Sequence, residues 1–359
     1  MRSSTGRISL FLLAAACLPA SAEEKADHWG WGLQPIIGYD DESSWTLGAN
    51  SVVYFNPDTS NPEQELDELN LVTTYSLNDA YNVNANVVKN LDAGDKSIEA
   101  TVGYERSPQE FQGIGRSTVD SALARYASTD IPFRIGVPVK VFDHLYVSPQ
   151  YDFLLHDVDQ VESDRGMAIV PPPEVARNLA SGIGLTVTYK TTNPGLYKRR
   201  GYVLSVSSTH YAPALGSTSE FEATSASGRL YIPVTTESVL GFQLRFETTS
   251  GDVPLPYLPT LGGHKLLRGF NGNRYVGNHC ISGQTELRFP IWGRFGGTVF
   301  AGAGEVANGL DQFDQHVKAA GGVGLRFAVQ KKQKINIRFD FTISSDDDTR
   351  KYIKLKEAF

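Results

Sequence analysis

Apolar and polar residues alternate along most of this chain. In AYNVNANVVKN, residues 80–90, asparagine separates tyrosine, valine and alanine, and in KINIRFDFTIS, residues 334–344, polar residues separate isoleucine and phenylalanine. A period of two places successive side chains on opposite faces of a β-strand. Each such segment is therefore predicted to be a strand with one apolar face and one polar face.

The alternating segments recur from about residue 32 to the last residue. No stretch of comparable length keeps a helical period, so the predicted fold class is all-β. The sixteen predicted strands lie near residues 32–39, 45–55, 67–77, 80–90, 96–105, 121–141, 144–155, 179–190, 201–211, 218–232, 237–249, 279–289, 295–304, 317–329, 334–344 and 350–359.

Two architectures accommodate so many alternating strands. In a soluble sandwich the apolar faces meet inside, and a chain of 359 residues would divide into several domains. In a transmembrane antiparallel β-barrel the apolar faces meet lipid and the strand number is even. The alternation of shorter and longer connections favours the barrel, although the long connection at 56–66 departs from it. The longer connections that follow odd-numbered strands are 106–119, 156–178, 250–278 and 305–316.

The start of the chain has the organisation of a secretory signal peptide. Arg2 and Arg7 precede the apolar run ISLFLLAAACLPA, and the small residues ASA precede Glu23. The apolar run is too short to span a bilayer as a stable helix. We therefore expect a signal peptide at 1–22, a short periplasmic segment at 23–31 and an outer-membrane β-barrel at 32–359.

Composition excludes several function classes. The formal net charge of −7, without a basic run, argues against a nucleic-acid partner. Of the two cysteines, Cys17 lies in the signal peptide, where a lipoprotein site is the alternative interpretation, so Cys280 has no partner for an intrachain disulfide. There is no G-x-S-x-G, H-E-x-x-H, phosphate-loop or paired-cysteine motif. We expect no enzyme activity, no metal site and no cofactor.

Three consecutive stretches late in the chain carry a family resemblance. They are LPTLGGHKLLRGFNGNRYVGNH, GQTELRFPI and GGTVFAGAGEV, and IIGYDDESSWTLGANSVVYF near the other end adds to them. Together they resemble the motifs of the BamA/TamA outer-membrane superfamily, also called bacterial surface antigens. Members of that family usually carry periplasmic POTRA domains before the barrel, and this chain is expected to be a barrel-only member.

The resemblance implies a site on the sixth outer loop, which folds into the barrel lumen in that family. The matching residues in this chain are Gly262, Gly263, Leu267, Arg268, Gly269 and Phe270. The family's arginine meets an acidic residue of the wall, because a guanidinium in a confined lumen needs a carboxylate partner. The family's F-x-D-x-G strand reads FAGAG here, with Gly302 in the place of the aspartate.

Another acid is therefore expected to receive Arg268. Asp340 and Glu286 both lie on polar strand faces, and Asp340 is slightly favoured because Glu286 already has Arg288 nearby. The alternative is that Arg268 is a solvated loop residue, as most loop arginines are. A loop folded into the lumen could also be purely structural, bracing and partly plugging the barrel.

The resemblance implies a second site at the seam between the first and last strands. In related machines a weakly paired seam opens and a client strand pairs with its free edge. Pro35 lacks a backbone donor and would weaken pairing there, unless it merely begins the strand. The seam residues expected in this chain are Pro35, Ile37, Tyr39, Ile353, Leu355 and Phe359.

The resemblance implies a protein of the outer membrane of a Gram-negative bacterium that assists the insertion or passage of proteins, or of lipids. Its expected partners are outer-membrane lipids, the insertion machinery that reads Phe359 during biogenesis, and an unfolded protein client. The alternative function is a passive or structural barrel, either a narrow channel or a surface antigen. Loss of the POTRA domains favours the alternative, and the retained loop motif favours the insertion factor.

Overall fold

The computed structural model describes residues 29–40, 44–55, 67–92, 95–115, 124–162, 176–192, 197–313, 316–330 and 335–359. The predicted signal peptide, 1–22, lies outside these ranges. The strands are β1 (Trp29–Asp40), β2 (Ser44–Phe55), β3 (Asp67–Ser76), β4 (Tyr81–Leu91), β5 (Lys96–Phe111), β6 (Ala124–Gly136), β7 (Val139–Phe142), β8 (Leu145–Glu162), β9 (Asn178–Lys190), β10 (Gly201–Tyr211), β11 (Phe221–Pro233), β12 (Val239–Gly251), β13 (Thr260–Leu261), β14 (Tyr275–Val276), β15 (His279–Trp292), β16 (Phe295–Ala307), β17 (Lys318–Gln330), β18 (Ile335–Ser344) and β19 (Thr349–Leu355).

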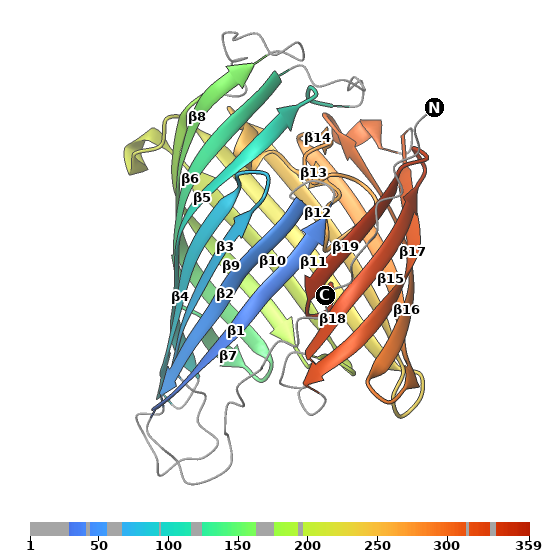
Figure 1. Ribbon diagram of the computed structural model, residues 1–359. Helices are drawn as coiled ribbons and strands as arrows, with labels where there is room; N and C mark the ends of the chain where they lie inside the picture. The colour runs from blue at the N-terminus through green and yellow to red at the C-terminus, as the bar shows by residue number, and fades with distance from the viewer. Residues whose placement is uncertain are drawn as a thin grey trace, which may run out of the picture.

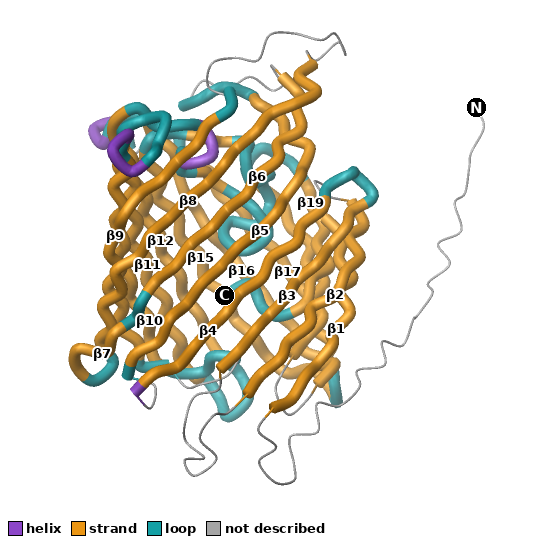
Figure 2. Tube along the Cα trace, turned by 90° about the vertical axis from the view of Figure 1, so that its left-hand side faces the viewer, coloured by secondary structure: helices purple, strands orange, loops and turns teal. Residues whose placement is uncertain are grey.

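The strands form one closed antiparallel barrel (Figure 1). Each wall strand pairs with its neighbours in the wall, and β1 pairs with both β2 and β19, which closes the sheet on itself. The short strand β7 continues β6 and pairs with the same neighbours, β5 and β8, so the wall has sixteen strands, as predicted. The strands are tilted around the wall when the barrel is seen from the side (Figure 2).

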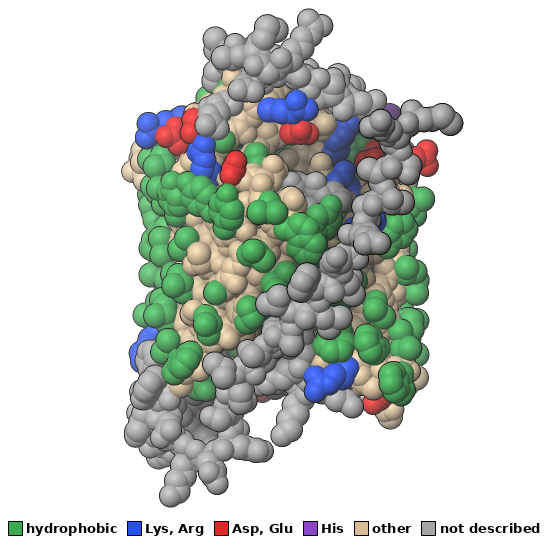
Figure 3. Space-filling model, viewed as in Figure 1, with side chains coloured by type: hydrophobic (Ala, Val, Ile, Leu, Met, Phe, Trp, Pro, Cys, Tyr) green, Lys and Arg blue, Asp and Glu red, His purple; other side chains and the backbone are tan. Residues whose placement is uncertain are grey.

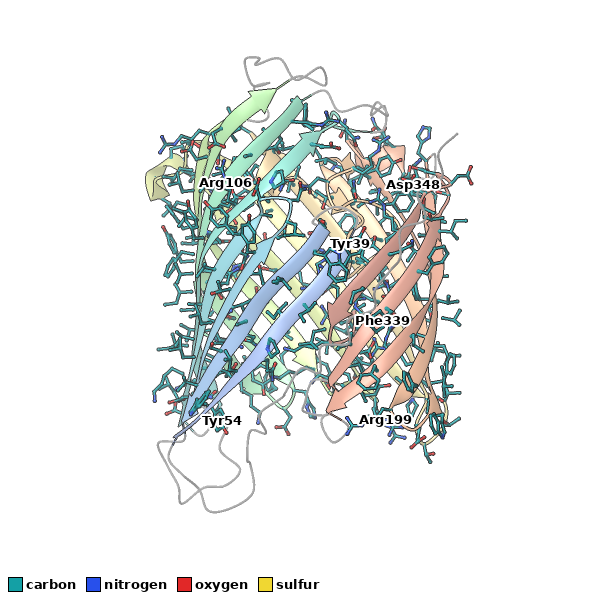
Figure 4. The ribbon with its side chains drawn as sticks, in the orientation of Figure 1. Tyr39, Tyr54, Arg106, Arg199, Phe339 and Asp348 are labelled. Atoms are coloured by element: carbon teal, nitrogen blue, oxygen red, sulfur yellow. The ribbon has the colours of Figure 1, made fainter. Side chains whose placement is uncertain are left out.

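The alternating pattern separates an apolar exterior from a polar interior. In β18, Phe339, Phe341 and Ile343 are exposed, whereas Asp340 and Thr342 between them are buried. The exposed apolar side chains cover the outer wall, and Phe339 points away from the barrel (Figures 3 and 4). Among the residues that the structure describes, no helix is long and apolar enough to cross a membrane.

The two ends of the barrel are named here by the course of β1, which begins at the lower end of the view in Figure 1 and runs upward. Tyr54 and Arg199 lie near the lower end, and Arg106 and Asp348 near the upper end (Figure 4). Strands β5 and β8 run to residues 111 and 162, beyond the predicted limits of 105 and 155. Their 16 and 18 residues exceed the roughly 9–11 that a tilted strand needs to cross a bilayer, so both project beyond the membrane.

Both ends of the chain's barrel segment differ from the prediction. β1 begins at Trp29 rather than near residue 32. The last strand was predicted to reach residue 359, but β19 ends at Leu355, where Lys356 follows with a φ of 67°. A left-handed backbone at a non-glycine residue cannot continue a strand. Phe359, which was expected among the seam residues of the last strand, therefore lies outside that strand.

The seam itself is short. Among the described residues, the register of β1 with β19 consists of Tyr39 opposite Ile353 and Asp40 opposite Tyr352, whereas β1 pairs with β2 along its whole length. The stretch of β1 from Trp29 to Gly38 has no Cα partner on β19, whose last residues, Lys354 and Leu355, are paired with β18.

Candidate functional site

The segment between β12 and β15 has a small two-stranded base. Thr260 and Leu261 of β13 pair with Val276 and Tyr275 of β14. The chain then turns at Gly262 and Gly263, with φ values of 114° and 104° that favour glycine over other residues. The Gly263 amide donates to the Phe270 carbonyl at 3.1 Å and closes a compact tip, residues 263–270.

The tip packs against the wall through apolar side chains. Leu267 is almost completely buried, although its φ of 54° is unusual for leucine. The Phe270 ring meets the Tyr275 ring edge-on, with centroids 5.9 Å apart. The buried apolar cluster consists of Leu261, Leu267, Phe270, Tyr275, Cys280, Val306 and Ala320. Since the cluster includes residues of β15, β16 and β17, it ties the tip to three wall strands.

Arg268 lies between two carboxylates of two wall strands, β15 and β18, that are separated by β16 and β17. Its Nη1 donates to Asp340 Oδ2 of β18 at 2.7 Å, and its Nη2 donates to Glu286 Oε2 of β15. The guanidinium carbon also lies 3.5 Å from the centroid of the Phe300 ring. Arg268 is 1% exposed, so water reaches neither the cation nor its partners. Arg268 is therefore not a solvated loop residue, which was the alternative interpretation of the sequence.

Three further arginines share these two carboxylates. Asp340 also accepts hydrogen bonds from Arg326 at 2.6 Å and from Arg338 at 3.0 Å. Glu286 also accepts one from Arg288 at 2.7 Å. All these side chains are buried, and a buried charge is tolerated only where hydrogen-bonded ions of opposite sign surround it.

We call the whole set the lumen charge cluster. Its members are Arg268, Glu286, Arg288, Arg326, Arg338, Asp340 and Glu357. Four arginines thus face three carboxylates.

Side chains of the wall also form hydrogen bonds with the backbone of the tip. Arg338 donates to the His264 carbonyl at 2.7 Å, and Gln284 donates to the Lys265 carbonyl at 2.6 Å. On the other side, the Gly269 amide donates to the Tyr352 hydroxyl at 3.2 Å, and the Gly269 carbonyl accepts from Arg350 Nε at 3.2 Å. Tyr352 and Arg350 belong to β19, so the tip also braces the last strand at the seam.

The backbone conformation at residue 269 and the close packing around it both favour glycine over any other residue. Its φ is 131°, and a Cβ at this position would lie 2.8 Å from the Ala320 Cβ. We expect Gly269→Ala to lower the free energy of unfolding by about 1–3 kcal/mol through overpacking and backbone strain. Gly272→Ala is the matched control, because nothing lies within 4 Å of its Cβ. Equal urea midpoints for the two variants would contradict the close packing of the tip.

The loop fills the space beside Gly302, the position where the family has an aspartate. A Cβ on Gly302 would meet the Gly283 carbonyl at 2.7 Å and Leu267 Cδ1 at 3.2 Å. Leu267 therefore occupies the space beside β16 where an acidic side chain would otherwise stand. The acids that receive Arg268 come instead from β15 and β18.

The sequence-based choice between Asp340 and Glu286 assumed one partner, but Arg268 contacts both acids. Glu286 accepts a hydrogen bond from Arg288 at one carboxylate oxygen and from Arg268 at the other. Sequence reasoning missed Arg326, Phe300, Arg350 and Tyr352 as neighbours of the tip. The alternation of VGLRFAV placed Arg326 on the polar face of its strand, so that signal was present.

The last four residues turn into the barrel and join the charge cluster. Glu357 accepts hydrogen bonds from Arg326 Nε at 2.8 Å and from Asn336 at 2.7 Å. The Phe359 carbonyl oxygen accepts from Arg288 Nη2 at 2.7 Å. The Phe359 ring lies against Gly241 of β12, whose Cβ position would be 2.9 Å from the ring. This tail therefore reaches from β19 to β12, past the inner faces of β15–β18.

The other predicted seam residues lie where the first and last strands approach. Pro35 lies inside β1 opposite Ala49 of β2, so it does not begin the strand. Ile37 is exposed on the outer face, and Tyr39 pairs with Ile353. Figure 4 shows Tyr39 on the upper part of β1.

Comparison with solved structures finds the same fold. BamA from Haemophilus ducreyi lacking POTRA domains 1–3 matches with a TM-score of 0.62 and 16% identity, over 91% of this chain and 70% of that one. CdiB from Escherichia coli matches with a TM-score of 0.61 and 14% identity, over 93% of this chain and 63% of that one. CdiB from Acinetobacter baumannii matches with a TM-score of 0.58 and 12% identity, over 92% of this chain and 60% of that one.

The chain thus spans less than two thirds of either CdiB chain. No curated protein matches the sequence. The family model that matches is the Omp85 superfamily domain, over residues 46–355, which includes the tip, the charge cluster except Glu357, and the wall except β1 and the start of β2. The chain therefore belongs to the Omp85 superfamily.

Proposed function

We propose that this outer-membrane barrel assists the insertion or secretion of proteins at the bacterial outer membrane, and that the β1–β19 seam is where a client strand binds. The observation that carries the proposal is the short seam. From Trp29 to Gly38, β1 has no Cα partner on β19, so part of its backbone edge is available to another strand. An unpaired strand edge binds extended peptides by continuing the sheet.

The loop tip supports this role as a brace of the seam. It contacts β15, β17 and β18 through Arg268 and the apolar cluster, and β19 through Tyr352 and Arg350. We infer that the loop is folded into the lumen and keeps β19 in place while the β1 edge is occupied. In the orientation we propose, the lower end of the barrel faces the periplasm.

An insertion assay in lipid vesicles tests the function. The purified barrel is reconstituted in vesicles, and a urea-unfolded eight-stranded outer-membrane barrel is diluted into them as the client. Protease protection then reports the fraction of client inserted with time. We expect insertion about tenfold or more faster than in vesicles that hold an unrelated closed porin at the same density. Equal rates in the two preparations, with steady ion conductance of this barrel, would instead identify a passive channel.

A further inference from the structure

The lipid-facing surface is hollowed over β10, β11, β12, β15 and β16. The hollow has a volume of about 900 Å³. Its floor is formed by the small residues Gly228, Gly283, Ala301 and Ala303. Exposed apolar side chains form its sides, namely Leu204, Leu230, Phe242 and Leu244. A concave apolar surface on a membrane barrel accommodates a lipid chain more closely than a flat wall does.

The strand register explains why the surface is concave. Leu204 lies opposite Gly228, Gly228 opposite Leu244, and Leu244 opposite Gly283. Large and small side chains therefore alternate along one row across the strands, and the row continues to Ala303. With neighbouring strands about 4.8 Å apart, the row from β10 to β16 is about 19 Å long. That length suits an extended acyl chain.

The hollow rises from the lower end of the barrel toward its middle. Tyr202, at one end of the hollow, is the second residue of β10, which begins at the lower end. Ala301 and Ala303, at the other end, lie in the middle of β16. A chain in the hollow would thus run from the lower membrane surface to the bilayer centre, which is the path of an acyl chain of that leaflet.

Cations gather beside the lower end of the hollow. In the described part of the β9–β10 connection and its flanks, the charged residues are Lys190, Lys198, Arg199 and Arg200. Burial and the neighbouring Lys190 lower the pKa of Lys198 from its usual value of 10.5. Lys190 Nζ lies 4.4 Å from the centroid of the Tyr146 ring. The Tyr189 and Tyr202 rings are stacked 5.6 Å apart beside these cations.

The neighbouring part of the same rim, around the β7–β8 turn, is different, because its lysines lie beside acids. Lys96 lies 2.8 Å from Asp92, and Lys140 lies 3.5 Å from both Asp95 and Asp143. In the described part of the β9–β10 connection, by contrast, every charged residue is a cation.

We propose that the hollow and the adjoining cationic connection form a binding site for an anionic phospholipid of the periplasmic leaflet. One acyl chain lies over the small residues of the floor, and the headgroup phosphate lies near Lys190 and Lys198. Each cation at a membrane surface attracts an anionic headgroup by about 1 kcal/mol, or about fivefold in affinity. The proposal uses the orientation given above, and lipopolysaccharide, which occupies the opposite leaflet, is not the expected ligand.

Native mass spectrometry of the full barrel tests the site. The purified protein is incubated with equal amounts of phosphatidylglycerol and phosphatidylethanolamine that carry the same acyl chains. We expect at least a fivefold preference for phosphatidylglycerol. Equal retention of both lipids would overturn the proposal, and so would preferential retention of lipopolysaccharide when that is added.

Two variants separate the headgroup from the chain. Lys190→Gln with Lys198→Gln is expected to abolish the preference for phosphatidylglycerol. Ala301→Leu with Ala303→Leu, which fills the hollow, is expected to reduce retention of both phospholipids at least fivefold.

The control for charge is Lys96→Gln with Lys140→Gln, and the control for filling is Ala85→Leu on the lipid-facing side of β4. The proposal fails if the controls lose lipid to the same extent as the site variants. Heat-dependent gel mobility verifies that every variant is folded.

Discussion

Replacing Asp340 with asparagine is expected to lower the free energy of unfolding by about 3–5 kcal/mol. Asp340 accepts hydrogen bonds from Arg268, Arg326 and Arg338, all buried, so the substitution leaves three guanidinium groups facing a neutral amide. The lumen charge cluster would then hold four arginines and two carboxylates. Water cannot hydrate the excess positive charge, because the cluster has almost no exposed surface.

Replacing Arg268 with methionine is expected to cost less than replacing Asp340, about 2–3 kcal/mol. Glu286 keeps Arg288, and Asp340 keeps Arg326 and Arg338, so each carboxylate still has a cation beside it. If Arg268 and Asp340 formed an isolated ion pair, the two substitutions would instead lower the free energy of unfolding equally. In the double variant, the second substitution is expected to cost less than it does alone, because the two residues interact directly.

Unfolding in urea, followed in detergent by heat-dependent gel mobility, measures these losses. Asp346→Asn is the matched control, since Asp346 lies in the β18–β19 turn and its ion pair with Lys318 at 2.7 Å is partly exposed. That change is expected to cost less than about 1 kcal/mol. If Asp340→Asn were no more destabilising than Asp346→Asn, the buried cluster would not stabilise the barrel.

The alternation of side chains was sufficient to predict the wall of this barrel. A membrane barrel has apolar lipid outside and polar residues inside, so each strand carries the same signal, and all sixteen predicted strands are present. Strand limits were less accurate where the chain leaves the membrane, as in β5 and β8. Beyond the bilayer no apolar face is required, and hydrogen bonding alone extends the strand.

The contacts inside the barrel could be predicted only in part. Alternation placed Glu286, Arg288 and Asp340 on inward faces, but it does not determine which inward side chains from non-adjacent strands, here β15 and β18, reach the same point. A single acid for Arg268 was therefore expected where two acids bind it. The inward turn at Lys356 had no local signal, because it depends on contacts of Glu357 and Phe359 with distant strands.

Locking the seam with a disulfide is expected to abolish client insertion. Tyr39 and Ile353 are opposite each other in the register of β1 with β19, so Tyr39→Cys with Ile353→Cys joins the two strands covalently. A client strand could then no longer separate them to pair with β1. We expect the insertion rate to fall at least tenfold, to that of vesicles without the protein, while the barrel remains folded.

A second disulfide in the same wall controls for the chemistry. Val206 and Ala226 are opposite each other in β10 and β11, away from the seam, so Val206→Cys with Ala226→Cys should leave insertion unchanged. The natural Cys280 is 1% exposed and is not expected to react with either pair. If both disulfides inhibited equally, general stiffening of the wall would explain the loss.

The most direct test is the insertion rate of the Tyr39→Cys, Ile353→Cys barrel before and after reduction in the same vesicles. If the seam binds the client, the oxidised barrel is inactive and the reductant restores the rate of the unmodified protein. An oxidised barrel that inserts the client as fast as the reduced one would contradict the proposed function of the seam.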